Sequence, residues 1–283
     1  MADDERPPGT DTNGAFPAAA PVGMLEHLSY LERDGVGLIT ITRPEVHNAI
    51  SLATMAEIER VLEWLETRSA AGAVVLTGAG DRSFVSGGDL KDFERITTRE
   101  AAVAMSLRMQ AITARLQALP LPVIGAINGD CLGGGCEVAL ACDIRIVSQR
   151  ARFGFKQVTL GITPAWGGLP RLVRLAGRAQ ALALLLTGQM IDATAAARVG
   201  LADRVEPPEH VRAAALELAR EIASNPPLAV RAIKRMVNER DGAGGGQAQQ
   251  FEAGLFAETW MSDDHGEALA ARKQRRAPNF RGR

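Results

Sequence analysis

The feature that most constrains the fold is the order in which short apolar runs and longer amphipathic segments follow one another. Apolar runs occupy residues 73–77, 123–127 and 143–148. They alternate with segments at 51–69 and 99–119, in which apolar residues recur at helical spacing. Short, continuous apolar strands that alternate with helices are typical of a parallel sheet covered on its faces. The sequence therefore predicts an α/β protein with a mostly parallel sheet.

Different patterns precede and follow this alternation. The dipeptide Asp34-Gly35 lies between two β-rich runs and predicts a hairpin before the first helix, for which Ser51 is the expected N-cap. After residue 167 the pattern becomes mostly helical. We expect helices at 167–175, 178–186, 192–198, 208–223, 226–240, 247–260 and 263–271, a short strand-like element at 203–206, and a flexible link at Gly242–Gly246.

These patterns divide the chain into three parts. Residues 1–23 are acidic at their start, contain four prolines and lack the basic and apolar regions of a secretion signal, so we expect a disordered tail. Residues 24–200 form the predicted catalytic core. Residues 201–283 form a predicted helical region that assembles subunits.

Charge and cysteine content exclude several classes of protein. The 32 Lys and Arg residues nearly balance 33 Asp and Glu residues, and aromatic residues make up only 4%, which argues against a nucleic-acid partner. No uncharged apolar stretch reaches the roughly 20 residues of a membrane span. Cys131, Cys136 and Cys142 match no zinc-binding spacing, so we expect buried thiols in a cytoplasmic protein and no metal site.

Two glycine-rich segments contain the residues that could take part in a reaction. They are Ser83–Lys91 (SFVSGGDLK) and Asn128–Glu137 (NGDCLGGGCE), each after a predicted strand, and the second enters a helix. Amides at a helix N-terminus are unpaired and favour negative charge, and glycine allows a ligand to approach them closely. Two such amides can form an oxyanion hole, with Glu137 in reach of a carbon α or β to the carbonyl. Turns without a ligand are the alternative interpretation of each segment alone.

Taken together, six stretches of the chain resemble the crotonase superfamily, also called the enoyl-CoA hydratase/isomerase family, over residues 25–283. The resemblance implies an α/β crotonase (ClpP/crotonase-like) fold of repeated ββα units with a C-terminal helical trimerisation region, assembled as a homotrimer or a dimer of trimers. It implies an acyl-CoA thioester substrate and no separate cofactor, because coenzyme A is part of the substrate. The matching stretches are RPEVHNAIS (43–51), SFVSGGDLKDF (83–93), NGDCLGGGCEVALACDIRI (128–146), FGFKQVTLGITPAWGGLPRLVRLAG (153–177), TGQMIDATAAARVGLADRV (187–205) and the closing RRAPNFRGR.

The resemblance also implies roles for particular residues. The amides of Gly88 and Gly134 would form the oxyanion hole, and Glu137 would be the general acid/base. Trp166 would shape the acyl pocket, with core packing as the alternative. At the C-terminus, Phe280, Lys273, Arg275 and Arg276 would contribute to a neighbour's coenzyme A pocket, with a solvated helix end as the alternative. The expected substrate-binding residues are Val46, Asn48, Ala49, Ser86, Gly87, Asp89, Leu90, Lys91, Gly133, Pro164 and Trp166.

One position departs from the family pattern. Hydratases of this family use two glutamates, and Gln157 stands where the second is expected, preceded by Lys156 in place of proline. Glutamine cannot exchange a proton at neutral pH, but it can orient water or substrate. Three interpretations follow: an enzyme that hydrates or isomerises an enoyl-CoA with Glu137 alone, a decarboxylase of a malonyl-type thioester, or a non-catalytic acyl-CoA-binding protein. RNA binding is disfavoured, because the helix at 99–119 offers only Arg99, Arg108 and Arg115.

Overall fold

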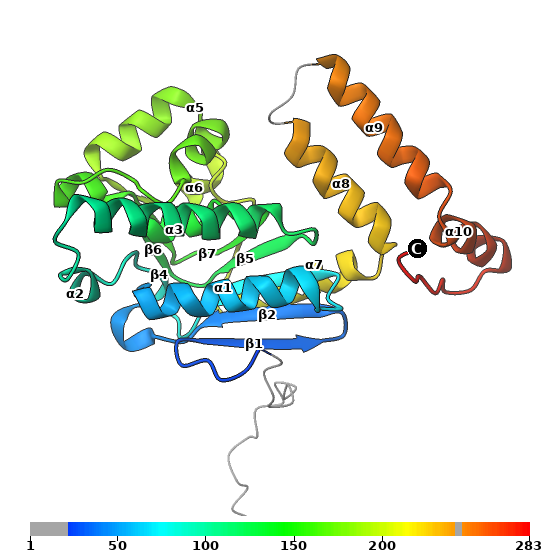
Figure 1. Ribbon diagram of the computed structural model, residues 1–283, viewed down its shortest axis with the longest axis horizontal. Coiled ribbons are helices and arrows are strands. Elements are labelled where there is room, and N and C mark those ends of the chain that lie inside the picture. The colour runs from blue at the N-terminus through cyan, green and yellow to red at the C-terminus, as the bar shows by residue number, and fades with distance from the viewer. Residues whose placement is uncertain (1–21, 241–244) are drawn as a thin grey trace, which may run out of the picture.

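The computed structural model describes residues 22–240 and 245–283 (Figure 1). The predicted disordered tail lies outside the described residues, apart from residues 22 and 23. Of the predicted flexible link, residues 242–244 also lie outside them, whereas residues 245 and 246 begin a helix. Within the described part of the chain, no helix is both long enough and apolar enough to cross a membrane.

A six-stranded sheet forms the centre of the molecule, with the strand order β1-β2-β3-β5-β7-β10. The predicted hairpin is confirmed, because β1 and β2 pair antiparallel around Asp34 and Gly35, both of which have positive φ. From β2 onward all neighbouring strands are parallel, as their continuous apolar sequences predict. The strands are β1 (Leu28–Arg33), β2 (Val36–Ile41), β3 (Ala73–Gly78), β5 (Val123–Ile127), β7 (Ile144–Ser148) and β10 (Arg204–Glu206).

A second sheet of four short strands lies beside the first. Apolar periodicity does not predict its strands, whereas the resemblance to the crotonase superfamily implies the ββα units to which they belong. The order of this second sheet is β4-β6-β8-β9, with β4, β6 and β8 parallel. Each of these three parallel strands follows a strand of the large sheet and is followed by a loop and a helix, which is the predicted ββα repeat. The strands are β4 (Ser83–Val85), β6 (Asp130–Leu132), β8 (Arg152–Gly154) and β9 (Met190–Asp192).

Helices cover both faces of the large sheet. Helices α1 and α3 contact each other on one side, and α7 packs on the other against β3, β5 and β7 (Figure 1). Ser51 caps α1 as predicted, since its hydroxyl accepts a hydrogen bond from the amide of Thr54. The helices are α1 (Leu52–Thr67), α2 (Leu90–Phe93), α3 (Arg99–Ala118), α4 (Gly134–Ala139), α5 (Gly168–Thr187), α6 (Ala193–Arg198), α7 (Val211–Ala223), α8 (Pro227–Arg240), α9 (Gly245–Trp260) and α10 (Asp263–Gln274), with 3-10 turns η1 (Pro44–Val46) and η2 (Lys156–Leu160).

Helix α5 shows how one glycine shapes an element. Separate helices were expected at 167–175 and 178–186, and α5 spans both. Gly177, at φ 75° and ψ 160°, interrupts the helical backbone between them. The two predicted helices are therefore present, joined at a kink that a glycine accommodates.

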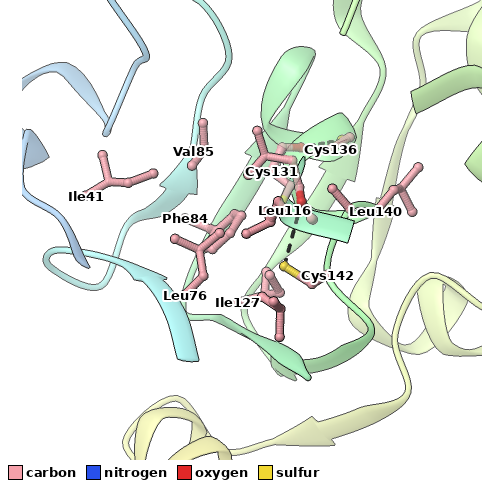
Figure 2. Packing of buried hydrophobic residues seen from close by; sticks show 14 of the residues in the cluster. Ile41, Leu76, Phe84, Val85, Leu116, Ile127, Cys131, Cys136, Leu140 and Cys142 are labelled. Carbon is pink, nitrogen blue, oxygen red and sulfur yellow. Dashed lines mark hydrogen bonds between the residues drawn. The ribbon is translucent and has the colours of Figure 1, made fainter. Parts of the chain in front are cut away.

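The three cysteines lie in the apolar core, as Figure 2 shows. All are free and buried. The Cys136 thiol donates to the carbonyl of Cys131 at 3.1 Å, and the Cys142 thiol contacts the carbonyl of Val138 at 3.7 Å. Their behaviour as small buried thiols is the one expected from the sequence.

Helices α8, α9 and α10 extend to one side of the sheets and their covering helices (Figure 1). A buried ion pair attaches α8 to the core, since Lys234 Nζ lies 2.6 Å from Asp143 Oδ2 and 2.9 Å from the carbonyl of Leu121. The division at residue 200 stays a prediction. The large sheet nevertheless continues into β10, and α7 covers that sheet.

Candidate active site

Three loops meet at a cavity of about 410 Å³, at the ends of β4, β6 and β8. Because carboxyl ends of parallel strands lie at one edge of a sheet, residues following these strands are brought together. All but two of the predicted site residues line this cavity, although their roles stay predictions. The lining residues are Val46, Ala49, Ser86, Gly87, Gly88, Asp89, Leu90, Lys91, Phe93, Met105, Gly133, Gly134, Glu137, Lys156, Gln157, Leu160, Ile162, Thr163, Ala165 and Trp166.

Asn48 and Pro164 are the two exceptions. Asn48 is 1% exposed, and its side-chain amide donates to the carbonyls of Ala79 and Ser83 at 3.0 and 2.8 Å. It also accepts a hydrogen bond from the backbone amide of Arg43. Asn48 thus fixes the loop that presents Val46 and Ala49, while Pro164 lies between two residues that line the cavity without lining it itself.

Several apolar lining residues were not predicted as part of the site. Met105 is one of the residues at helical spacing in the segment 99–119, and it packs against the core and also lines the cavity. Leu160 and Ile162 are 55% and 56% exposed, so they form an apolar rim at its mouth. Leu160 ends the short 3-10 turn η2 and Ile162 lies in the loop after it, and neither segment has a periodic pattern that could mark these positions in the sequence.

The amides of Gly88 and Gly134 lie in loops that touch each other. A Cβ atom on Gly87 would lie 3.3 Å from the amide nitrogen of Gly134, and Gly87 itself has φ +105°. Gly134 is the first residue of α4. In the described structure, neither the Gly88 nor the Gly134 amide donates to a protein acceptor. Both amides are therefore available to a ligand acceptor.

Glycine is required at both positions by the packing around them. A Cβ atom on Gly88 would overlap the ring of Phe93, and one on Gly134 would overlap the ring of Trp166. Trp166 is 4% exposed and lines the cavity, so it takes part both in the core and in the wall of the site.

Glu137 is buried, at 1% exposure, and its carboxylate accepts three hydrogen bonds. The amides of Trp166 and Gly168 each donate to Oε1 at 2.9 Å, and Nε2 of Gln157 donates to Oε2 at 3.0 Å. Burial raises the pKa of the Glu137 carboxyl, although these amide donors oppose the shift. A carboxyl group with a raised pKa beside two free amide donors is suited to proton transfer.

Gln157 lies next to this carboxylate and is 6% exposed. An ionised carboxylate only accepts hydrogen bonds, so the atom of Gln157 that faces it must be Nε2. This orientation leaves Oε1 of Gln157 buried without a protein partner. An acceptor is therefore available beside Glu137 for a donor supplied by a ligand or a water molecule.

Two other charged residues of the cavity, Asp89 and Lys156, have structural partners, whereas Lys91 is exposed to solvent. Arg43 donates to Asp89 at 2.9 Å, and Asp89 also caps α2 by accepting from the amide of Asp92. Lys156 Nζ donates to the carbonyl of Gly188 at 2.6 Å. Asp89 and Glu137 are the acids among the described lining residues, and only Glu137 lacks an ion-pair partner. Glu137 is consequently the residue best placed for acid/base chemistry.

Comparison with known proteins assigns the chain to a family. The sequence model for Enoyl-CoA hydratase/isomerase matches residues 32–283. The chain belongs to the enoyl-CoA hydratase/isomerase family. It is therefore an enzyme of the hydratase or isomerase type, and an acyl-CoA thioester is the substrate class that fits this family.

Individual members of the enoyl-CoA hydratase/isomerase family match over nearly their whole length. The Short-chain-enoyl-CoA hydratase of Clostridium acetobutylicum is 40% identical over 255 residues, which cover 89% of this chain and 97% of the relative. The Crotonyl-CoA hydratase of Syntrophomonas wolfei is 35% identical, with 90% and 98% covered. The crystal structure of Enoyl-CoA Hydratase from Bacillus anthracis superposes with a TM-score of 0.88 at 34% identity, covering 91% of this chain and all of that one. The predicted crotonase fold is thereby confirmed.

Proposed function

We propose that the protein adds water to a short 2-enoyl-CoA, with Gly88 and Gly134 as oxyanion donors and Glu137 as the single acid/base. The observation that carries the proposal is the position of Glu137, a buried carboxylate held by two backbone amides in a cavity that also presents two unpaired glycine amides. The names of the relatives, a short-chain-enoyl-CoA hydratase and a crotonyl-CoA hydratase, support the reaction type.

The proposed steps use only groups of this chain and a water molecule. The thioester oxygen accepts hydrogen bonds from Gly88 and Gly134, which polarise the conjugated double bond. The water oxygen attacks C3 while Glu137 takes one of its protons, and Oε1 of Gln157 accepts from the other O–H. The electron pair of the double bond moves to form the enolate. Glu137 then returns its proton to C2, which regenerates the carboxylate and yields the 3-hydroxyacyl-CoA.

A single acid/base also suffices for two related reactions. Glu137 can move a proton between C4 and C2 of a 3-enoyl-CoA, which is isomerisation. A malonyl-type thioester can lose CO₂ to leave the same enolate, which needs the oxyanion donors but no base. Decarboxylation is the second candidate. With Gln157 at this position, Glu137 is the acid of the described cavity lining without an ion pair, and loss of CO₂ does not require a second acid/base group.

A panel of thioesters distinguishes these reactions. Crotonyl-CoA, a 3-enoyl-CoA and methylmalonyl-CoA are each incubated with the protein, and the product masses are recorded. We expect a gain of one water on crotonyl-CoA and loss of this activity in Glu137→Gln. CO₂ release from methylmalonyl-CoA that survives Glu137→Gln would instead favour the decarboxylase. Binding of the thioesters without turnover would contradict all three reactions and favour an acyl-CoA-binding protein.

The proposed reaction also carries expectations about cofactors, location and partners. We infer that the reaction needs no separate cofactor and no metal, since the proposed steps are proton transfers assisted by backbone amides. We also retain the cytoplasm as the proposed location, which suits the three free thiols. The substrate is proposed to be the small-molecule partner, with no nucleic acid involved.

A further inference from the structure

Arg171, in the first turn of α5, is a buried cation without a charged neighbour in contact. It is 8% exposed, and within residues 22–240 and 245–283 it forms no ion pair. Its donors contact the carbonyl of Gly167 at 2.8 Å, Oε1 of Gln117 at 2.8 Å and Oγ1 of Thr113 at 3.3 Å. A guanidinium stays charged when buried, so a position with only neutral partners is unfavourable unless a negative charge lies nearby.

The negative charge lies on the other side of one peptide group. The carbonyl of Gly167, which accepts from Arg171, belongs to the same planar peptide as the Gly168 amide, which donates to Glu137 at 2.9 Å. Hydrogen bonds in series polarise one another, so the guanidinium strengthens the bond that reaches the carboxylate. Burial lowers the pKa of Arg171, and the charge of Glu137 raises it in opposition.

The Trp166 amide, which is the second main-chain donor to Glu137, is held in the same way but by a neutral group. The carbonyl of Ala165 accepts from the Ser106 hydroxyl at 2.7 Å, and the amide of the same peptide, on Trp166, donates to Glu137 at 2.9 Å. Thr113 donates to the next carbonyl, that of Trp166, at 2.7 Å. Helix α3 and Arg171 therefore fix the loop at residues 165–168, and the two peptides that hold Glu137 differ in whether the group behind them is charged.

The other ionisable groups around Glu137 do not replace this charge. Burial raises the pKa of the Cys136 thiol on α4, so it stays neutral. Lys156, on η2, is held by the carbonyl of Gly188, and Asp89 across the cavity is paired with Arg43. Lys91 lines the cavity on α2 and is exposed to solvent, which screens it. Arg171 itself faces Arg174 and Cys142 as well as Glu137.

We propose that Arg171 is a positioning residue that holds the 165–168 loop and, through the Gly167–Gly168 peptide, keeps Glu137 in its ionised, proton-accepting form. The inference rests on the proposed function only in taking Glu137 as the acid/base. Its physical content is an electrostatic coupling between two buried groups that do not touch. It goes beyond a structural role, because it requires the charge of Arg171 and not only its hydrogen bonds.

Three substitutions separate charge from hydrogen bonding. Arg171→Gln keeps a neutral donor toward Gly167, and Arg171→Lys keeps the charge. Ser106→Ala removes the closer of two neutral donors to the Ala165 carbonyl, the other being Nε2 of Gln110 at 3.3 Å. The pH dependence of kcat/KM is measured for each with the thioester that the wild type turns over. We expect the acidic limb of Arg171→Gln to move up by about one pH unit, which is about tenfold lower activity on that limb. In Arg171→Lys and Ser106→Ala the limb stays near the wild-type position, whatever the change in kcat.

A spectroscopic titration makes the test independent of turnover. The carboxyl band of protonated Glu137 is followed by infrared difference spectroscopy against pH and assigned by its absence in Glu137→Gln. The proposal requires this titration to move to higher pH in Arg171→Gln and to stay in place in Arg171→Lys. Unchanged titration in Arg171→Gln would overturn it and leave Arg171 a purely structural role. Failure of every thioester to react would overturn the proposed function alone, since the titration still decides the coupling.

Discussion

At the scale of single residues, Glu137 shows how a protein keeps an acid both buried and usable. Two main-chain amides and one side-chain amide replace the water that burial removes. Burial nevertheless dominates, so the pKa of Glu137 stays above its ordinary value. The folded state accordingly binds the Glu137 proton more tightly than the unfolded chain does. Ionisation of this residue therefore reduces the free energy of unfolding as the pH rises from about 4.3 through the folded value.

Glu137→Gln is expected to separate activity from stability. Turnover should fall by about 10²–10⁴-fold, the usual contribution of one acid/base group. The melting temperature at neutral pH should not fall, because the amide of Gln157 can rotate and present Oε1 to the new amide group. Thermal unfolding scans between pH 4 and 8 check this, and the wild type should lose stability relative to the variant as the pH rises. A variant that melts well below the wild type at pH 7 would contradict the argument.

Gln157→Glu is expected to convert the site toward two-acid chemistry. The new carboxyl group would lie next to Oε2 of Glu137, where two like charges cannot both persist, so one carboxyl stays protonated. A protonated acid beside an ionised base suits the addition of water. One positioned acid/base group typically contributes about 10²–10⁴-fold to a rate. We therefore expect the rate of crotonyl-CoA hydration to rise by about tenfold or more. Gln157→Ala serves as the control and should hydrate more slowly than the wild type. Hydration that falls in Gln157→Glu would count against the role given to Gln157.

At the scale of elements, the start of α4 brings a donor amide and an aromatic wall together. A direct substitution of Gly134 would test both at once, because any side chain there overlaps Trp166. The Trp166→Ala background removes the overlap. In that background, Gly134→Ala keeps the amide and Gly134→Pro removes it at a first helical position, where proline is tolerated.

The proline variant is expected to be the slower of the two by about 10²–10³-fold, the effect of losing one oxyanion donor. Single-turnover rates with the preferred thioester provide the measurement. Circular dichroism of both double variants shows that α4 and the rest of the fold are retained. Equal rates in the proline and alanine variants would contradict the assignment of the Gly134 amide as an oxyanion donor.

The attachment of α8 depends on the buried pair Lys234–Asp143. Burial lowers the pKa of Lys234 and raises that of Asp143, and each charge opposes the shift of the other. Lys234→Met would leave the Asp143 carboxylate with the Val123 amide and the nearby charge of Arg145 but without this ion pair, so the cost should be at most the about 3–5 kcal/mol typical of breaking a buried pair. Urea unfolding of Lys234→Met should show a lower free energy of unfolding and a lower midpoint than the wild type. The control Lys273→Met, at the exposed end of α10, should leave the urea midpoint unchanged. Similar midpoints for both variants would mean that the pair adds nothing to stability.

At the scale of the whole molecule, apolar side chains remain exposed on the helices outside the core. Ile233 and Val237 on α8 are 57% and 60% exposed, and Leu186 at the end of α5 is 69% exposed. Contiguous exposed apolar surface commonly marks an interface. The sequence-based prediction of a homotrimer or a dimer of trimers would cover such side chains.

Light scattering of the purified protein should accordingly give three or six times the chain mass of 30.0 kDa. The double substitution of Ile233 and Val237 by Asp should lower this mass. Arg231→Asp, on the same helix, reverses the charge at an exposed position that is already charged and should leave the assembly intact. A wild-type mass of 30.0 kDa would refute the prediction.

How far the sequence could predict the fold depended on element length. Strands of five or six residues and helices of three turns or more carry a periodic pattern, and they were found within a few residues of their ends. The three-residue strands β4, β6 and β8 carry none, so periodicity could not locate the small sheet beside the site, and only the resemblance implied the ββα units that contain these strands. Gly88, Gly134, Glu137 and Gln157 were placed through motif resemblance. Arg171 was not singled out, because nothing in the sequence indicates that it and Glu137 flank one peptide.

The hold on Glu137 has a consequence for substitution at position 157. Two of its three hydrogen bonds come from main-chain amides, which every amino acid except proline supplies. These two hydrogen bonds to the Glu137 carboxylate therefore do not depend on which side chain occupies position 157. We therefore expect that a substitution at position 157 can change the chemistry available beside Glu137 while both main-chain donors to its carboxylate are kept.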